Sequence, residues 1–230
     1  MLRLIIGNKV YSSWSLRGWL AAKLSGLPFE EVVVPLFDAD WPARKALPDL
    51  APSRGKVPIL WDGDSPVWES LAIIEHLDAL TGGTRFWPEE KAARALARSI
   101  SAEMHAGFMA LRQACPMNLR HVFPPRETSP DVAADVERIV ALWQDARERF
   151  GHGGDFLFGG FGAADIMFAP VVTRFVTWSI PVPGPARAYM DAVLDHPFMR
   201  DWRAGADAET WIIARLEPAE DDSGAAAPRG

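Results

Sequence analysis

Residues 53–80 constrain the fold more than any other part of this chain. Two short apolar runs, at 57–61 and 66–68, are separated by the turn sequence DGD, a pattern typical of a β-hairpin. Apolar residues then recur at helical spacing from Leu71 to Leu80. The stretch therefore predicts a hairpin that leads directly into a helix.

Three residues of this stretch bear on function. Pro58 lies within the first run and belongs at the start or edge of its strand, because proline cannot donate to a β-ladder. Glu69 and Ser70 open the helix, whose first backbone N–H groups lack partners and attract an anion such as a carboxylate. In a second interpretation Glu69 and Ser70 only cap the helix. From this stretch alone both interpretations stay open.

The composition narrows the class of protein. The chain has 230 residues, of which 49% are hydrophobic, and it is long enough for one large domain or two small ones. A net charge of −6 argues against nucleic-acid and anionic-membrane binding. The single cysteine, Cys115, excludes an intramolecular disulfide and is expected to be a buried small hydrophobic side chain. No signal peptide or long uncharged apolar stretch is recognisable, so a cytoplasmic location is expected.

The first 80 residues alternate strand and helix signals. Apolar runs at 2–6 and 29–36 predict two strands. Between them a helix is predicted, with Ser12 and Ser13 at its N-cap and Gly26 at its C-terminal end. Together with the hairpin and its helix, this order indicates a thioredoxin-like α/β layout.

The chain is predicted to contain two domains. A thioredoxin-like α/β domain at residues 1–80 is followed by a linker at 81–88 and an all-helical domain at 89–216. Residues 217–230 lack apolar periodicity and are expected to form a disordered tail. The predicted helices of the second domain cover residues 89–115, 130–150, 163–178, 185–194 and 197–216.

Three segments make the chain recognisable: GKVPIL at 55–60, WESLAIIEHL at 68–77 and YSSWSLRGWLAAKLSG at 11–26. With these segments the chain resembles the cytosolic-type glutathione S-transferases over nearly its whole length. The third segment is similar to the zeta and tau classes, and the resemblance implies a bacterial, serine-type member. The resemblance implies the glutathione S-transferase fold, with an α/β thioredoxin-like domain and an all-α C-terminal domain.

The segment FGAADIMFAP at 161–170 resembles the family's capping motif in its central buried helix. The family usually has Ser or Thr three residues before Asp165, whereas this chain has Gly162. Glycine offers no side-chain oxygen to the helix start. The helix is therefore expected to depend more on a hydrophobic staple between Phe161 and Ile166.

The resemblance implies that glutathione binds to the first domain as cosubstrate. Pro58 is expected to be cis, and the Val57 backbone to pair with the cysteinyl segment as a short antiparallel strand. The γ-glutamyl carboxylate is expected on the N–H and hydroxyl of Ser70, and the α-amino group on Glu69. Lys56 is the expected counter-charge for the glycyl carboxylate.

The same resemblance implies that a serine hydroxyl stabilises the glutathione thiolate, which is the nucleophile. Ser12 aligns with the family's catalytic serine, with Ser13 as the second choice and Ser15 as a distant third. A hydrogen bond to a charged group contributes roughly 1.5–3 kcal/mol, which lowers the thiol pKa by roughly one to two units. In the alternative interpretation these serines only cap the helix.

The second domain is expected to supply the electrophile pocket. Met104, Phe108, Met109 and Arg112 recur at helical spacing in the first predicted helix of this domain. Such a stripe forms either a core face or an adaptable binding wall. If it lines the pocket, Arg112 suggests an anionic second substrate. Trp14, beside the serines, is a candidate for the floor of the same cleft.

These observations predict a glutathione transferase that acts on a small electrophile in detoxification, with a homodimer expected from the family. A zeta-like isomerase is a variant of this function, and a non-catalytic binding or protein-interaction module is the alternative. The five histidines lack metal-ligand spacing, so no metal is expected. The chain also has no GxSxG elbow for a hydrolase.

Overall fold

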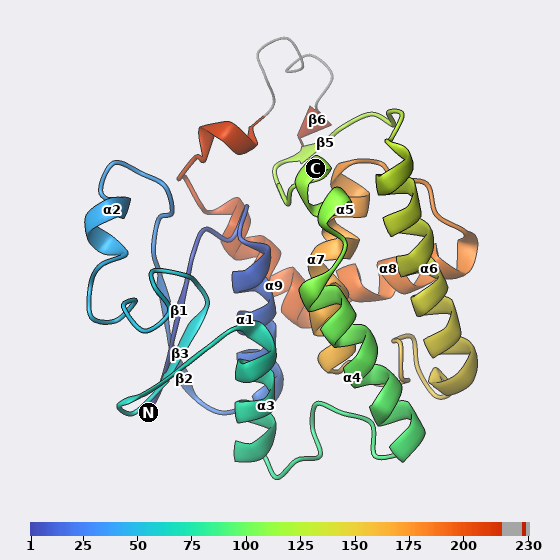
Figure 1. Ribbon diagram of the computed structural model, residues 1–230, viewed down its shortest axis with the longest axis horizontal. Coiled ribbons are helices and arrows are strands. Elements are labelled where there is room, and N and C mark those ends of the chain that lie inside the picture. Colours follow the sequence, from blue (N-terminus) through green and yellow to red (C-terminus); the bar gives the residue numbers. More distant parts are fainter. Residues whose placement is uncertain (218–226, 229–230) are drawn as a thin grey trace.

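The computed structural model describes residues 1–217 and 227–228 (Figure 1). Figure 1 shows a sheet on one side of the molecule, helices of the C-terminal half on the other, and two helices of the N-terminal half between them. No helix of the described residues is both long and apolar enough to span a membrane. Most of the predicted tail, at 218–226 and 229–230, lies outside the described residues.

The N-terminal domain has the predicted thioredoxin-like layout. Its four strands lie in the order β2-β1-β3-β4, with β1 parallel to β2 and antiparallel to β3, and with β3 antiparallel to β4. The elements in chain order are β1 (Leu2–Ile6), α1 (Ser13–Ser25), β2 (Phe29–Val33), α2 (Trp41–Arg44), β3 (Ile59–Asp62), β4 (Ser65–Trp68) and α3 (Ser70–Leu80). The predicted hairpin and helix are thus β3, β4 and α3, and the fold class is confirmed.

The C-terminal domain is built from six helices among the described residues. They are α4 (Lys91–Ala106), α5 (Met109–Ala114), α6 (Pro130–Phe150), α7 (Ala163–Thr177), α8 (Gly184–Asp195) and α9 (Pro197–Asp207). The predicted helices at 130–150, 163–178 and 185–194 are confirmed by α6, α7 and α8. One short ladder pairs β5 (His121–Val122) with β6 (Ala227–Pro228), so a fragment of the predicted disordered tail forms a strand.

The prediction of one continuous helix at 89–115 is wrong, because the helix is interrupted between α4 and α5. Gly107 has an extended backbone, and Phe108 follows in the left-handed region with φ of 58°. A Cβ on Gly107 would lie 2.9 Å from the Glu103 carbonyl oxygen, so only glycine fits this bend. Arg112 reaches back across the break and donates to the carbonyls of His105 and Gly107, both at 3.3 Å.

The predicted helix at 197–216 is also too long. Helix α9 ends at Asp207, and a short 3-10 helix, η1 (Ala214–Leu216), follows an irregular segment. The intervening sequence TWII is rich in β-branched and aromatic residues, which favour extended backbone.

Helix α7 forms the centre of the molecule and packs against α1 and α4. Its start is capped by Asp165, whose carboxylate accepts from the N–H groups of Gly162 (2.9 Å) and Leu157 (3.1 Å). Burial raises the pKa of Asp165 to about 6. The carbonyl of Phe86 in the linker accepts from Ala163 N–H, and a Cβ on Gly162 would lie 2.9 Å from that oxygen. The linker therefore takes the space that a serine or threonine cap would need.

The proposed staple between Phe161 and Ile166 stays a prediction. Phe161 stacks on His196, with 4.0 Å between ring centroids, and Ile166 is fully buried in the main core. That core is continuous through both domains, while a smaller cluster on the other face of the sheet joins Ile5, Leu50 and Ile59.

Helix α1 lies directly against the loop that enters β3. A Cβ on Gly18, in the middle of α1, would come within 2.7 Å of the Cβ and Cγ of Pro58. No real Cβ contact is that short, so a larger residue at Gly18 must move the helix or the loop. Glycine here costs helical propensity but allows the close approach.

We predict that Gly18→Ala lowers the free energy of unfolding by up to about 2 kcal/mol. Overpacking costs about 1–3 kcal/mol, and the gain in helix propensity, about 1 kcal/mol, offsets only part of it. Urea unfolding measures the change. Gly205→Ala in α9 is the matched control, because the three atoms nearest to a Cβ there all belong to the flexible side chain of Lys9. An equal effect of the two substitutions would contradict the close approach.

Candidate functional site

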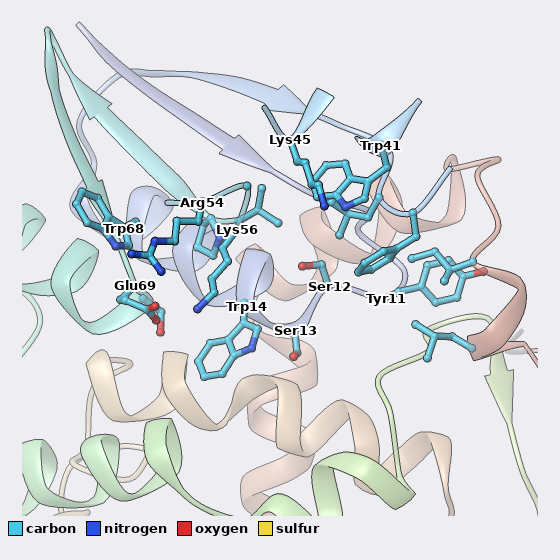
Figure 2. A pocket seen from close by; sticks show the side chains of 18 of the residues that line it. Tyr11, Ser12, Ser13, Trp14, Trp41, Lys45, Arg54, Lys56, Trp68 and Glu69 are labelled. Atoms are coloured by element: carbon cyan, nitrogen blue, oxygen red, sulfur yellow. The ribbon is translucent and has the colours of Figure 1, made fainter. Parts of the chain in front are cut away.

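A cavity of about 680 Å³ opens where the N-terminal domain faces the helical domain (Figure 2). Its walls come from the start of α1, the loop around α2, the loop before β3, the start of α3, α5 and the segment after α9. Among its lining residues are these predicted site residues: Ser12, Ser13, Trp14, Lys56, Val57, Pro58, Glu69, Ser70 and Arg112.

Three predicted pocket residues do not line this cavity. Met104 is fully buried and Phe108 is 7% exposed, and both pack in the core. Met109 is half exposed and lies outside the cavity lining. The prediction assumed one continuous helix with one stripe, but the break at Gly107 separates Met104 from the other three residues. Of that stripe, only Arg112 lines the cavity.

Ser12 both caps α1 and lines the cavity. Its Oγ accepts from the N–H of Ser15 at 3.3 Å and lies 2.8 Å from Ser15 Oγ. Ser15 Oγ in turn accepts from the Gly7 N–H at 2.9 Å. The three groups form a hydrogen-bonded chain that leads from the end of β1 to the cavity wall. Capping and exposure to the cavity are therefore compatible at this position.

Ser13 has a different environment. It is 8% exposed, and its Oγ accepts from Arg174 Nη2 of α7 at 3.1 Å. Figure 2 shows the Ser13 hydroxyl turned toward the helices of the second domain, away from Ser12. Ser13 therefore contacts the domain interface, while Ser12 faces the N-terminal side of the cavity.

The start of α3 has no side-chain cap, contrary to the interpretation that Glu69 and Ser70 serve only that purpose. Glu69 has a φ of 69°, which lies in a backbone region that non-glycine residues rarely adopt. Residues with such strained backbone are concentrated at functional sites. Its carboxylate lies 3.6 Å from His105. Ser70 is 1% exposed, and its hydroxyl lies 3.7 Å from Met167 Sδ. The Ser70 hydroxyl thus faces α7. The polar groups that this helix start offers to the cavity are therefore its backbone N–H groups.

The loop before β3 completes the N-terminal side of the cavity. The Val57–Pro58 peptide bond is cis. Arg54 and Lys56 extend toward Glu69, and Lys45 lies across the cavity beside Trp41 (Figure 2). Positive side chains thus predominate here, although the chain as a whole carries a net charge of −6.

Sequence reasoning identified Lys56 and missed other lining residues. Arg54 stands only two positions before Lys56, and this proximity to a predicted site residue could have identified it as a lining residue. Tyr11 and Trp68 likewise adjoin the predicted residues Ser12 and Glu69. The other missed residues lie on segments that are distant in sequence; they include Trp41, Lys45, Ile213, Arg215 and Leu216.

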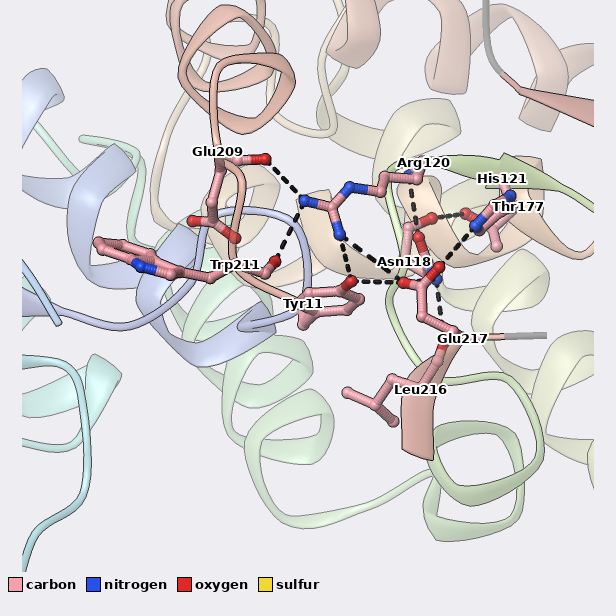
Figure 3. Close-up of polar contacts among 9 residues, drawn as sticks. All are labelled: Tyr11, Asn118, Arg120, His121, Thr177, Glu209, Trp211, Leu216 and Glu217. Atoms are coloured by element: carbon pink, nitrogen blue, oxygen red, sulfur yellow. Dashed lines mark hydrogen bonds and ion pairs between the residues drawn. The ribbon is translucent and has the colours of Figure 1, made fainter. Parts of the chain in front are cut away.

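The segment after α9 lines part of the cavity and is held by a polar network (Figure 3). The Glu217 carboxylate accepts from the Tyr11 hydroxyl and lies 2.8 Å from His121 Nε2. Arg120 donates to the carbonyls of Glu209 and Trp211 in the same segment, at 2.6 and 3.1 Å. These contacts join residues 209–217 to the N-terminal domain and to the loop around β5.

The network shifts the pKa values of Glu217 and Tyr11. Burial alone raises the pKa of the Glu217 carboxyl, but the hydrogen bonds from Tyr11 and His121 outweigh burial, and the net pKa is lowered. The pKa of the Tyr11 hydroxyl is raised, first by burial and then by its hydrogen bond to Glu217. The ionised carboxylate is thus the form that holds the segment.

Cys115 is 2% exposed, which confirms the prediction that it is a buried side chain. Burial raises the pKa of its thiol, so the thiol is held in its unreactive form.

We predict that Glu217→Ala lowers the free energy of unfolding by about 1–3 kcal/mol, because it removes charge-assisted hydrogen bonds from a partly buried group. Hydrogen exchange of residues 209–217 should increase most. Glu137→Ala, at an exposed position of α6, is the control. Unchanged exchange in residues 209–217 of Glu217→Ala would contradict this anchoring role.

The stabilisation by Glu217 should also depend on pH. Because its pKa in the folded protein lies below the ordinary value of 4.5, the stabilisation is fully present above that pH. It is lost as the pH falls through the folded pKa. The difference in unfolding free energy between the wild type and Glu217→Ala should therefore shrink in acid, and a constant difference would exclude the carboxylate as its source.

Solved structures share the architecture of this chain. A glutathione transferase homologue from Burkholderia, solved with bound glutathione, is 24% identical, covers 90% of this chain and 99% of its own, and has a TM-score of 0.66. The tau-class glutathione S-transferase from mango, Mangifera indica, is 18% identical, covers 90% of this chain and 96% of its own, and has a TM-score of 0.64. These likenesses show the fold.

Sequence relatives come from the same family. Glutathione S-transferase U10 of Arabidopsis thaliana is 33% identical over 42% of this chain, and the match spans 40% of that protein. Glutathione S-transferase U16 of the same plant is 28% identical over 70% of this chain and 67% of its own length.

The models of the two family domains match this chain in the expected order. The glutathione S-transferase N-terminal domain matches residues 11–80, and the C-terminal domain matches residues 127–207. The first range contains α1, the loop with Pro58 and the start of α3, and the second contains α7. Together the two matches cover more than half of the chain, which therefore belongs to the glutathione S-transferase family.

Proposed function

We propose that this protein is a glutathione transferase that binds glutathione in the interdomain cavity and activates its thiolate with Ser12 for attack on a small electrophile. The observation that supports this most is the meeting of three features in one cavity: the Ser12 hydroxyl, the uncapped start of α3 and a group of cationic side chains. Glutathione needs all three, because it carries one thiol and two carboxylates.

In this proposal the γ-glutamyl carboxylate lies at the start of α3. The Ser70 backbone N–H and the positive end of the helix dipole attract it. Glu69 accepts from the α-amino group. The Ser70 hydroxyl is not assigned to the ligand, since it is buried against Met167.

The other end of glutathione lies along the loop before β3. The Val57 backbone pairs with the cysteinyl segment, and Lys56 faces the glycyl carboxylate, with Lys45 and Arg54 adding to the positive field. Pro58 belongs to the same loop and lines the cavity.

Ser12 is the preferred activating serine for a geometric reason. Ser12 Oγ donates to Ser15 Oγ, which also accepts from the Gly7 N–H. Because a hydroxyl rotates to suit its partners, the Ser12 hydrogen turns toward the bound thiolate, and Ser15 Oγ then donates its own hydrogen to Ser12 Oγ. Each bond of such a chain polarises the next. Ser13, in contrast, is bound to Arg174 on the opposite side.

A glutathione-dependent isomerase and a non-catalytic binding module use the same cavity, and turnover assays separate them from the transferase. The homodimer, the cytoplasmic location and a role in detoxification stay predictions from the family resemblance.

We predict that glutathione and S-hexylglutathione both bind and stabilise the folded protein. At a hundred times its dissociation constant a ligand stabilises the native state by about 2.7 kcal/mol, which thermal melting detects and calorimetric titration quantifies. Lys56→Met should weaken the binding of both ligands, whereas Arg126→Met, at an exposed position outside the cavity, should not. If neither ligand binds the wild type, the proposed function fails.

We further predict that Ser12→Ala raises the pKa of the bound glutathione thiol by about one to two units, as expected for loss of one hydrogen bond to a thiolate. Thiolate absorbance in the ultraviolet, measured against pH at saturating glutathione, gives this pKa directly. Ser12→Thr keeps both the hydroxyl and the helix cap and should retain most of the shift. A larger effect of Ser13→Ala than of Ser12→Ala would assign the role to Ser13 instead.

A further inference from the structure

Three arginines from three helices meet at the part of the cavity wall formed by Ser13 and Trp14. The Cζ atoms of Arg17 in α1 and Arg112 in α5 lie 4.5 and 4.7 Å from the centroid of the Trp14 ring. Arg174 in α7 donates to Ser13 Oγ at 3.1 Å. The exposed fractions of Arg17 and Arg174 are 1% and 5%. Buried guanidinium groups of both domains thus converge on two adjacent residues that line the cavity.

None of these arginines forms an ion pair with an acidic side chain of residues 1–217. Apart from the bond of Arg174 to Ser13 Oγ, the hydrogen bonds that they donate among the described residues go to main-chain carbonyl oxygens. Arg17 Nη2 and Arg174 Nε are buried and have no partner among the described residues. A buried charge without a counter-charge is costly, and so is a buried N–H without an acceptor. The arrangement therefore favours an acceptor that carries negative charge.

The three charges also act on one another. The pKa of Arg174 is lowered to about 10, first by burial and then by the charge of Arg112. The pKa of Arg17 is lowered well below its ordinary value by burial and then by Arg174 and Arg112. Arginine stays protonated in proteins, so the mutual repulsion of the three groups persists until an anion relieves it.

The position of the three arginines indicates which anion they bind. Arg112 lines the cavity itself, together with Ser13 and Trp14, so a ligand in the cavity can reach the cluster. The two carboxylates of glutathione are matched on the N-terminal side, by the start of α3 and by Lys56. The arginines lie toward the helical domain, where the second substrate is expected. A planar carboxylate fits the guanidinium fork through two parallel hydrogen bonds.

We infer that Arg17, Arg112 and Arg174 form a carboxylate subsite for the second substrate. The inference rests on the transferase function proposed above and adds the chemical class of the electrophile, a small molecule that carries a carboxylate. Arg112 binds the carboxylate directly. Arg174 and Arg17 supply positive charge from behind, and Arg174 also fixes the orientation of Ser13.

Matched glutathione conjugates test this inference. Each pair has the same number of carbon atoms on sulfur and differs only in a terminal carboxylate or methyl group: S-carboxymethyl against S-ethyl, S-(3-carboxypropyl) against S-butyl, and S-(5-carboxypentyl) against S-hexyl. The three lengths cover different distances from the thiol to the cluster. In at least one pair, calorimetry should show that the wild type binds the carboxylated conjugate about tenfold more tightly, as expected for a charge-assisted hydrogen bond.

Substitutions locate the source of this preference. Arg112→Met should abolish it and leave the affinity for the methyl-terminated conjugate within about twofold. Arg112→Lys keeps the charge but loses the fork, and should retain part of the preference. Arg126→Met removes an exposed arginine that stacks on Trp178 outside the cavity, and should keep the full preference.

The outcomes separate the two proposals. If the wild type binds no conjugate, the proposed transferase function and the subsite both fail. If it binds both members of every pair alike, glutathione binding stands and the carboxylate subsite is overturned. Stabilisation of the wild type by inorganic phosphate, combined with equal binding within every pair, would also overturn it, since the cluster would then hold a free anion. This comparison needs only the wild type and remains decisive if Arg112→Met fails to fold.

Discussion

The contact between α1 and α7 is the interaction on which the rest of the structure depends. It joins the two domains, and hydrogen bonds cross it from Arg17 to the Met167 carbonyl and from Arg174 to Ser13. Because α1 begins at the cavity, the same contact fixes the position of the serines. Stability of the domain interface and geometry of the site are therefore two consequences of one packing arrangement, and a shift of α7 would be felt at the start of α1.

This interface contains more positive charge than a purely structural role requires. Apolar side chains of similar volume in place of Arg17 and Arg174 would avoid the cost of desolvation, and buried ion pairs are often replaced in that way without loss of stability. The arginines instead lie beside a cavity, with unpaired N–H groups. Positive φ at Glu69 and the missing side-chain cap of α3 occur on the opposite wall. Features that lower the stability of the folded protein are thus concentrated around one cavity. This is expected where ligand binding compensates for the lost stability.

The sequence predicted those parts of the site that depend on local signals. The hairpin that leads into α3, the Ser12 cap of α1 and the Gly26 end of that helix follow from short-range rules, and the structure contains them. Periodicity could not reveal the break at Gly107, because Met104, Phe108 and Arg112 fit a continuous helix as well as an interrupted one. Nor could it place the segment after α9, because the contact of Tyr11 with Glu217 joins residues 206 positions apart. Contacts of that kind depend on the assembled fold.

The start of α7 shows how a departure from the expected motif is accommodated. Glycine replaces the usual hydroxyl residue at position 162, yet the helix start does not lose its hydrogen bonds. Asp165 accepts from Gly162 and Leu157, and the Phe86 carbonyl accepts from Ala163. The linker thereby becomes part of the cap and ties the end of the first domain to the central helix of the second. The close approach of the linker explains why position 162 is a glycine. A side chain there would displace the Phe86 carbonyl, which now accepts a hydrogen bond at the helix start.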